Sequence, residues 1–263
     1  MRHTTPRPGI YYGWCIVATT FLIALVTVGA RGGFGVFVLP MSEDFGWNRS
    51  TISLAAAIGA LVNGFSQPFL GRLYDRLGGR KLILVSLVSL GVCTMLLALT
   101  NHIVFLIGLF GVVMAIATGG SSLTTTSALL SKWFHRQRAT AMALNAAGAS
   151  VGGLLLVPLT VYLIGLAGWR TTWVVLGLMV LVLVVPPVYF LLKDDPADLG
   201  LLPDGDPQPS DADQAGPARL GPLEVEYWRD SFRSTPMWQL CGGYFVCGFT
   251  IALISTHFVP FAI

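Results

Sequence analysis

Long apolar stretches separated by short polar segments make up most of the chain. Seven of these stretches reach the roughly 18 residues that an α-helix needs to cross about 30 Å of hydrocarbon. They cover residues 12–39, 51–70, 82–100, 103–131, 140–165, 171–192 and 237–261. Because a bilayer core offers no water to the backbone amides, each stretch is predicted to be a membrane-spanning helix.

The composition supports this prediction, since only 11% of the residues are charged and 54% are hydrophobic. Such a chain has too few ionic side chains to cover a water-exposed surface. The first apolar stretch is far longer than the roughly 7 to 15 residues of a signal-peptide core, so we expect a retained span. The four cysteines are scattered within the spans, and no catalytic pair, metal-ligand spacing or phosphate-binding loop is apparent. We therefore expect no enzyme, no metal site and no cofactor.

Lysine and arginine are distributed unevenly between the polar connections. Only Arg49 and Arg170 lie in one set of alternate connections. The other set holds Arg2, Arg7, Arg72, Arg76, Arg80, Lys81, Lys132, Arg136, Arg138, Lys193, Arg219, Arg229 and Arg233. The positive-inside rule then predicts a multi-pass protein of the inner (plasma) membrane with a cytoplasmic N-terminus. The net charge of +3 is therefore interpreted as a topology signal, and nucleic acid is not expected as a partner.

The pattern predicts an all-α membrane protein with three regions. Residues 1–192 form a six-helix transmembrane bundle, and residues 237–263 form one further helix. Residues 193–236 are rich in Asp, Pro and Gly, and such a segment buries too little apolar surface to offset its ordering entropy. We expect it to be a cytoplasmic linker.

The polar segment 71–81 has the pattern Gly-x3-Asp-Arg-x-Gly-x-Arg-Lys. It resembles the signature loop of the major facilitator superfamily, with matches at Gly71, Asp75, Arg76, Gly78, Arg80 and Lys81. The resemblance implies two six-helix halves with a substrate site between them and transport by alternating access. The chain then corresponds to the N-terminal half plus the seventh helix, and we expect it to be truncated. The resemblance also implies a gating role for these loop residues, because the family's Asp contacts the other half of the transporter.

A second segment narrows the resemblance. The run Lys132-Trp133-Phe134-His135-Arg136, continuing to Ala147-Gly148, is similar to the entry of the fifth helix in monocarboxylate transporters. The runs around Gly13-Trp14 and Phe45-Gly46-Trp47 resemble bacterial relatives of that family, including oxalate/formate-type exchangers. This resemblance implies a small carboxylate as substrate, with protons as a possible coupling ion. The fourth span lacks the Arg that drug/proton antiporters usually carry there.

Arg31 is the only charged residue inside the seven predicted spans. A buried Arg costs about 2.5 to 3.5 kcal/mol on insertion scales, so such a residue usually faces a cavity or a partner. Its guanidinium can hold a carboxylate through two parallel hydrogen bonds, and the related monocarboxylate transporters carry a Lys near this position. The alternative is an Arg that extends to the outer headgroups.

Several polar residues in the spans are further candidates for substrate binding. Ser121, Thr124 and Thr125 in the fourth span are predicted to share one helical face. The amides of Asn63, Gln67 and Asn145 fit cavity lining as well as contacts between helices. His257 could take part in proton coupling or lie at the membrane interface. Gly148 and Gly152, by contrast, form a Gly-x3-Gly pair that predicts close helix packing.

Three functions remain open from the sequence. The first is a secondary transporter of small organic anions that uses Arg31 to attract the substrate. The second is a facilitator-family transporter of a neutral or drug-like substrate. The third is a non-transporting, truncated membrane protein.

Overall fold

The structure, a computed structural model, describes residues 11–201, 204 and 234–261. Between 234 and 261 it describes the side chains of residues 234–248 and 250. The chain divides into two compact units, residues 1–207 and residues 208–263.

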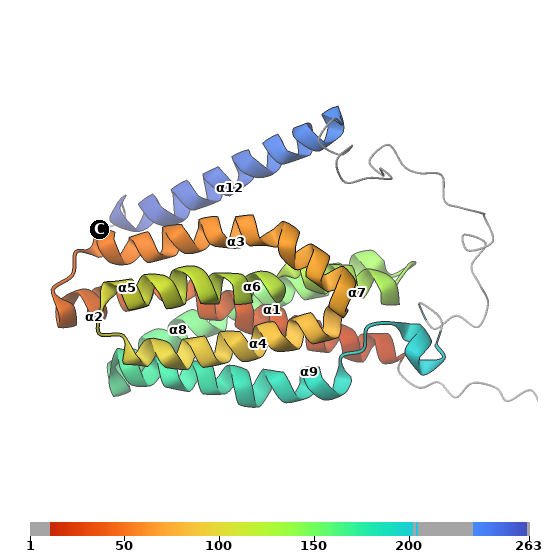
Figure 1. Ribbon diagram of the computed structural model, residues 1–263, viewed down its shortest axis with the longest axis horizontal. Coiled ribbons are helices and arrows are strands. Elements are labelled where there is room, and N and C mark those ends of the chain that lie inside the picture. Colours follow the sequence, from red (N-terminus) through yellow and green to blue (C-terminus); the bar gives the residue numbers. More distant parts are fainter. Residues whose placement is uncertain (1–10, 202–203, 205–233, 262–263) are drawn as a thin grey trace, which may run out of the picture. The chain divides into compact units, whose positions relative to one another are not determined.

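The described part of the first unit is a bundle of helices connected by short loops (Figure 1). Its α-helices are α1 (Tyr12–Gly32), α2 (Phe34–Phe45), α3 (Arg49–Leu77), α4 (Gly79–Leu96), α5 (Ile103–Leu106), α6 (Ala115–Gly120), α7 (Leu123–Trp133), α8 (Arg138–Met179) and α9 (Val185–Leu191). Two π-helical segments, η2 (Ile107–Met114) and η3 (Val180–Val184), join α5 to α6 and α8 to α9. Short 3₁₀ turns are η1 (Leu97–Leu99) and η4 (Pro196–Leu199).

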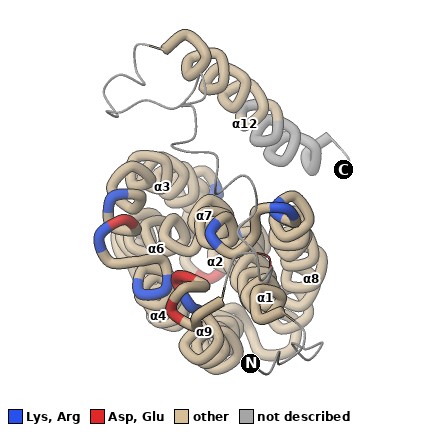
Figure 2. Tube along the Cα trace, turned by 90° about the vertical axis from the view of Figure 1, so that its right-hand side faces the viewer, with Lys and Arg blue, Asp and Glu red and all other residues tan. Residues whose placement is uncertain are grey.

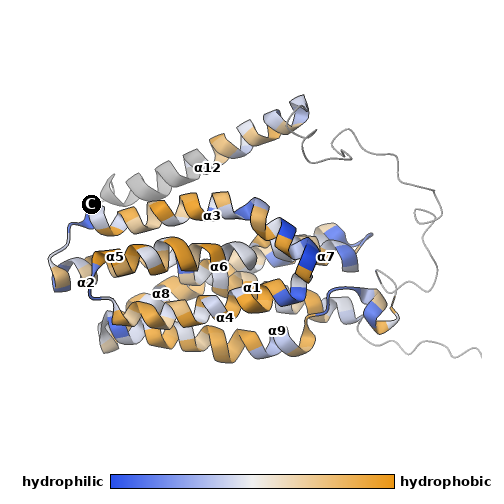
Figure 3. Cartoon of the chain, viewed as in Figure 1, coloured by the Kyte–Doolittle hydropathy of each residue, from blue (hydrophilic) through white to orange (hydrophobic). Residues whose placement is uncertain are grey.

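Five helical stretches in the described residues are long and apolar enough to cross a membrane. They are Tyr12–Phe45, Arg49–Leu77, Gly79–Leu99, Ile103–Trp133 and Arg138–Leu191. Apolar residues dominate these stretches, whereas hydrophilic residues gather towards the ends of the bundle (Figure 3). The chain is therefore a multi-pass membrane protein.

The 54-residue stretch Arg138–Leu191 contains two spans, because the chain reverses at Gly168. This glycine has φ 77° and ψ 165°, a conformation that side chains with a Cβ rarely adopt. On one side of it α8 starts at Arg138, and on the other α9 ends at Leu191, whose carbonyl accepts a hydrogen bond from Tyr12 at the start of α1. The described residues of the first unit therefore form six spans.

One end of the bundle carries most of the described Lys and Arg residues, and we call it the basic end (Figure 2). It contains the α3–α4, α7–α8 and α9–η4 connections. At the opposite end, Trp169 donates a hydrogen bond of 2.6 Å from Nε1 to Asp44 Oδ2. The guanidinium of Arg170 lies 5.7 Å from the centroid of the Phe45 ring in α2, so these contacts join α2 to the start of the sixth span.

The Gly-x3-Gly pair makes a close helix contact, which confirms the prediction from its spacing. A Cβ built on Gly152 would lie 2.1 Å from the backbone oxygen of Leu25, and one on Gly148 would lie 2.5 Å from that of Phe21. The missing side chains let α8 approach α1 backbone to backbone. The core of the bundle also includes the stacked rings of Phe37 and Trp173, with centroids 3.8 Å apart.

Two predicted elements differ from the structure. The polar segment 71–81 is helical except at Gly78, because α3 continues to Leu77 and α4 begins at Gly79. Helix formation does not stop where the hydrocarbon ends, since polar side chains can extend into water from a continuing helix. The fourth span, predicted as one helix, includes the π-helical η2 and is interrupted between α6 and α7.

In the second unit, α12 (Thr235–Phe261) has 27 residues and covers the predicted seventh span. Its described side chains include the exposed apolar residues Trp238, Leu240, Tyr244, Phe245 and Val246. A helix with apolar side chains exposed in this way is suited to lipid or to a partner helix.

Candidate functional site

Arg31 lies in the last turn of α1, just before the cap at Gly33. Its side chain borders two adjoining cavities. Among the residues that the structure describes, its guanidinium has no hydrogen-bond or ion-pair partner. An ionised group in such a position gains a large stabilisation from an anion that enters the cavity.

The larger cavity has a volume of about 600 Å³. Its lining includes hydroxyl, amide and guanidinium groups beside apolar ones, and we call it the polar cavity. Helix α1 contributes Arg31 and Thr27, α3 contributes Asn63 and Gln67, and the fourth span contributes hydroxyl groups. The complete lining is Ala24, Thr27, Val28, Arg31, Gly32, Asn63, Gln67, Thr118, Ser121, Ser122, Leu123 and Thr124. A guanidinium surrounded by neutral donors can bind a small anion.

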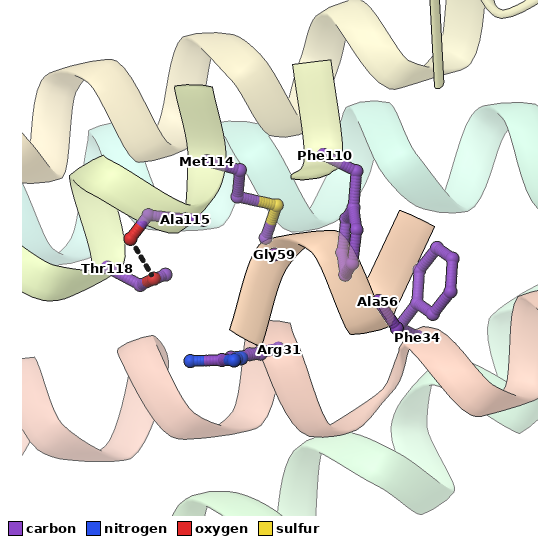
Figure 4. A pocket seen from close by; sticks show the side chains of 8 residues that line it. All are labelled: Arg31, Phe34, Ala56, Gly59, Phe110, Met114, Ala115 and Thr118. Carbon is purple, nitrogen blue, oxygen red and sulfur yellow. Dashed lines mark hydrogen bonds between the residues drawn. The ribbon is translucent and has the colours of Figure 1, made fainter. Parts of the chain in front are cut away.

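The smaller cavity, which we call the apolar chamber, has a volume of about 120 Å³ and shares Arg31 and Thr118 with the polar cavity. Figure 4 shows the guanidinium directed towards the side of Thr118, with the rings of Phe34 and Phe110 on the other side. Those two rings are stacked, with centroids 3.9 Å apart. The remaining lining residues are Ala56, Gly59, Met114 and Ala115.

The fourth span is interrupted at Ser121 and Ser122, and both residues line the polar cavity. Ser121 has φ −105° and ψ 20°, and Ser122 has an extended conformation with φ −68° and ψ 164°. Ser122 caps α7, since its Oγ accepts a hydrogen bond of 3.4 Å from the amide of Thr125. The expectation that Ser121, Thr124 and Thr125 share one helical face is therefore wrong, because Ser121 precedes the break and the other two follow it.

The structure brings some of the predicted binding residues together and separates others. Ser121 and Thr124 line the polar cavity with Arg31. Thr125 is buried, and it lines a different hollow near the basic end. Asn145 is fully buried and donates a hydrogen bond of 2.9 Å to Thr126 Oγ1, so it lies between α8 and α7 and not at the polar cavity. His257 belongs to α12, and its side chain is outside the described residues.

The polar cavity also contains polar residues outside the predicted binding set, among them Thr27 and Thr118. Thr27 lies one helical turn before Arg31, and its hydroxyl donates a hydrogen bond of 3.3 Å to Ser121 Oγ. Thr118 lies on α6, and its hydroxyl oxygen accepts a hydrogen bond of 3.4 Å from the side-chain amide of Asn63. The same amide donates a hydrogen bond of 2.8 Å to the backbone carbonyl of Ala115. The four-residue spacing of Thr27 and Arg31 was the available signal, since residues i and i+4 share a helix face.

Asp75, at the end of α3, lines a hollow of about 340 Å³ near the basic end. Its other lining residues are Gln67, Pro68, Gly71, Tyr74, Thr124, Thr125 and Ala128. Lys132 approaches this region from α7, with Nζ 5.6 Å from the centroid of the Tyr74 ring. The hollow therefore has an acidic group in its lining.

Asp194 supports the turn between α3 and α4, a role that the sequence did not reveal. Its Oδ1 accepts a hydrogen bond of 2.6 Å from the amide of Arg80 at the start of α4. Gly78 has φ 84°, and a Cβ there would lie 2.6 Å from Asp194 Oδ2, so the close approach requires glycine. The guanidinium of Arg80 donates a hydrogen bond of 2.6 Å to the carbonyl of Tyr189. Asp194 thus stabilises a helix N-terminus, where a negative charge is favourable.

Asp204 makes a similar contact at the start of α8. Its carboxylate accepts hydrogen bonds from the backbone amides of His135 at 2.8 Å, Arg136 at 2.6 Å and Gln137 at 3.4 Å. Desolvation raises the pKa of this carboxyl group, but the three backbone hydrogen bonds outweigh it and hold the pKa below its ordinary value. The beginning of the predicted linker is therefore bound to the basic end at residues 194 and 204.

Comparisons with known proteins identify the fold. The family model described as Major Facilitator Superfamily matches residues 20–263. The chain belongs to the major facilitator superfamily. A solved structure of a bacterial homologue of the human lysosomal transporter Spinster, inward-facing and unoccupied, is similar over 73% of this chain and 45% of its own, with a TM-score of 0.62 and 18% identity. This similarity shows the facilitator fold.

Two curated relatives indicate the closer similarities within the superfamily. An uncharacterized MFS-type transporter of Bacillus subtilis, YcxA, is 27% identical over 98% of this chain and 58% of its own length. Monocarboxylate transporter 13 of Rattus norvegicus is 29% identical over 65% of this chain and 40% of its own. The chain thus spans about half the length of the curated relatives it matches, and it is monocarboxylate-transporter-like, as the sequence predicts.

Proposed function

We propose that this chain is part of a secondary transporter of small organic anions, in particular monocarboxylates, which works by alternating access. The observation that carries this proposal is the guanidinium of Arg31, which borders a polar cavity of about 600 Å³ and lacks a partner among the described residues. A carboxylate is the natural complement of such a group, because it accepts two parallel hydrogen bonds. The similarity to monocarboxylate transporters favours the same substrate class.

The neutral groups around Arg31 assist in this role. Thr27, Thr118 and Ser121 present hydroxyl groups, while Asn63 and Gln67 present amides. These groups orient a bound carboxylate without competing with it for Arg31, because none of them carries a negative charge. A proton can accompany the anion in such a transporter, and coupling through His257 stays a prediction.

The loop residues at the basic end have the gating role in this proposal. Asp75 lines an open hollow, and in the family its counterpart contacts the other half of the transporter. The turn between α3 and α4, just after Asp75, is stabilised by the contacts of Asp194 with Gly78 and with the amide of Arg80. The net placement of Lys and Arg further supports a cytoplasmic basic end in the plasma membrane.

The first test measures uptake of labelled lactate, pyruvate, formate and oxalate into proteoliposomes that contain the complete gene product carrying this chain. We expect Arg31→Gln to reduce carboxylate uptake at least tenfold, because it removes a charge-assisted pair worth about 1.5 to 3 kcal/mol. Arg31→Lys keeps the charge without the bidentate geometry, so partial uptake is expected. Arg49→Gln is the matched control, since Arg49 begins α3 and lines neither cavity.

Competition experiments separate the anion transporter from its alternatives. Lactamide and other uncharged analogues should not inhibit lactate uptake. Unchanged uptake in Arg31→Gln would remove Arg31 from the mechanism. Inhibition by neutral compounds, with none by carboxylates, would instead support a transporter of neutral or drug-like substrates.

A further inference from the structure

The break in the fourth span at Ser121 and Ser122 is held from two neighbouring helices. Before the break, Thr27 of α1 donates its hydrogen bond of 3.3 Å to Ser121 Oγ. After the break, the side-chain amide of Asn145 in α8 donates a hydrogen bond of 2.9 Å to Thr126 Oγ1 in α7. The four side chains in these two bonds are buried. Buried bonds to different helices therefore flank the break.

The bond from Asn145 is connected to the backbone at the break through a single hydroxyl group. The hydroxyl of Thr126 accepts from Asn145 and donates to the carbonyl oxygens of Ser122 and Leu123, each at 3.2 Å. These two carbonyls belong to the cap and to the first residue of α7. Ser122, Leu123 and Thr124 also line the polar cavity. The amide of Asn145 thus acts on the turn of α7 that borders the cavity.

Packing alone does not account for an amide at position 145. Asn145 is 0% exposed, and its Oδ1 has no hydrogen-bond partner among the residues that the structure describes. A buried oxygen without a partner lowers the stability of the folded state. An apolar side chain of similar size would avoid this cost, so the amide is expected to serve a purpose other than the contact between α7 and α8.

We propose that Asn145 and Thr126 are positioning residues, which hold the first turn of α7 in the orientation that places Ser122 and Thr124 in the wall of the polar cavity. Neither of the pair lines that cavity. Orientation matters because successive residues of an α-helix lie about 100° apart around its axis. A turn rotated by one residue would therefore exchange Thr124 for a neighbour. The inference rests on the proposed function for what the cavity binds.

Two substitutions separate positioning from stability. Thr126→Val removes the hydroxyl and leaves the amide of Asn145 unpaired, so the Tm in detergent should fall. Asn145→Leu removes the amide, and the double variant Asn145→Leu/Thr126→Val leaves no polar group of this pair unpaired. Because the amide of Thr126 still donates to the carbonyl of Ser122 at 3.0 Å, the double variant should regain a Tm near that of the wild type.

Transport then shows whether the pair does more than stabilise the fold. Initial rates of labelled lactate uptake are measured over a range of concentrations in proteoliposomes that contain the complete gene product. In the double variant the KM should rise about fivefold, the size of effect expected from one net hydrogen bond, with little change in the maximal rate. Thr126→Ser keeps the hydroxyl and should keep the wild-type KM.

Thr94→Val is the matched control for the loss of a buried hydroxyl. Thr94 is 0% exposed, like Thr126, and its hydroxyl donates at 2.7 Å to the carbonyl of Leu90 four residues earlier in α4. No side-chain amide bonds to this hydroxyl in the described part of the chain. Thr94→Val should therefore leave the KM at the wild-type value.

Thiol labelling detects the orientation of α7 without any transport. In a background without native cysteines, the rate at which Thr124→Cys reacts with a small charged methanethiosulfonate should be lower when the double substitution is present. Gln67→Cys lines the same cavity from α3, so its reaction rate should be equal in both backgrounds.

The possible failures are distinguishable. A double variant with the wild-type KM and unchanged labelling of Thr124→Cys would overturn the proposal, and the pair would then only pack α8 against α7. A raised KM with unchanged labelling would also overturn it, as would an equal rise in Thr94→Val. Absence of lactate uptake in the wild type would overturn the proposed function, whereas the labelling rates would still decide whether the pair orients α7.

Discussion

Charged side chains of the first unit differ in whether they have a hydrogen-bond partner within the chain. The carboxylates of Asp194 and Asp204 are bound by backbone amides at the starts of α4 and α8. The guanidinium of Arg31, in contrast, has no partner among the described residues. Charges that stabilise the fold are thus paired within the chain, whereas the charge beside the cavities remains available to a ligand.

Asp204 leads to a prediction about the pH dependence of stability. Desolvation raises its pKa, and the stronger effect of hydrogen bonds from the amides of Arg136, His135 and Gln137 lowers it below the ordinary value. A lowered pKa in the folded state means that the stabilisation is present above about pH 4 and is lost as the pH falls through the lowered value. Thermal unfolding in detergent should therefore show a lower Tm for Asp204→Asn at pH 7, and this difference should vanish at low pH.

A matched substitution provides the control for this prediction. Asp198→Asn removes an exposed carboxylate from η4 for which no hydrogen bond is found in the described part of the chain. Its Tm should remain close to that of the wild type throughout the pH range. A difference between wild type and Asp204→Asn that persists unchanged to pH 2 would show that the carboxylate charge does not stabilise α8.

At the scale of helices, the contact between α1 and α8 depends on two missing side chains. Gly152→Val would place its Cβ 2.1 Å from the backbone oxygen of Leu25, and backbone cannot move aside as a side chain can. Overpacking of this kind costs about 1 to 3 kcal/mol. We expect a Tm lowered by several degrees and a smaller monodisperse peak in size-exclusion chromatography.

Gly153→Val is the control for that prediction, because it adds the same side chain one residue further along α8, where nothing lies within 4 Å. It should behave like the wild type in both measurements. If Gly152→Val and Gly153→Val unfold at the same temperature, α1 and α8 do not pack as closely as described. Gly152→Ala, with a smaller group in the same place, should give an intermediate loss.

The helices themselves were largely predictable from the sequence, because membrane insertion requires long apolar segments with internally bonded backbones. Their ends were less predictable, since α3 continues to Leu77 after the apolar stretch has ended. The break at Ser121 and Ser122 has no clear signal in hydropathy, because Gly119, Gly120 and the hydroxyl residues are all compatible with a helix in lipid. Irregular backbone is tolerated at this depth only where it lines a cavity or is buried in protein.

The candidate site combines elements that are far apart in the sequence. Arg31 was predictable because it is the only charged residue in the predicted spans. Its neighbours Asn63 and Thr118 were harder to assign, since their distance from Arg31 depends on how α3 and the fourth span pack. Asn145 was predicted as a binding residue because its amide suits a polar cavity. In the structure this amide instead donates a hydrogen bond to Thr126 and so links α8 to α7.

The distribution of charge predicts the orientation of the protein in the membrane. Lys and Arg gather at the basic end of the first unit (Figure 2), and the positive-inside rule places such an end in the cytoplasm. The exposed Asn48 precedes α3 at the opposite end, whereas the exposed Gln137 precedes α8 at the basic end. Single cysteines at these two positions therefore report on opposite faces of the membrane.

The labelling experiment begins from a background in which the four native cysteines are replaced, because these would otherwise react. They are Cys15, Cys93, Cys241 and Cys247. In intact spheroplasts a membrane-impermeant maleimide should label Asn48→Cys but not Gln137→Cys, and permeabilisation should make both reactive. Labelling of Gln137→Cys alone in intact spheroplasts would reverse the orientation. The hollow lined by Asp75 would then lie at the outer face of the membrane. Asp75 could not have the proposed gating role at the cytoplasmic side in that orientation.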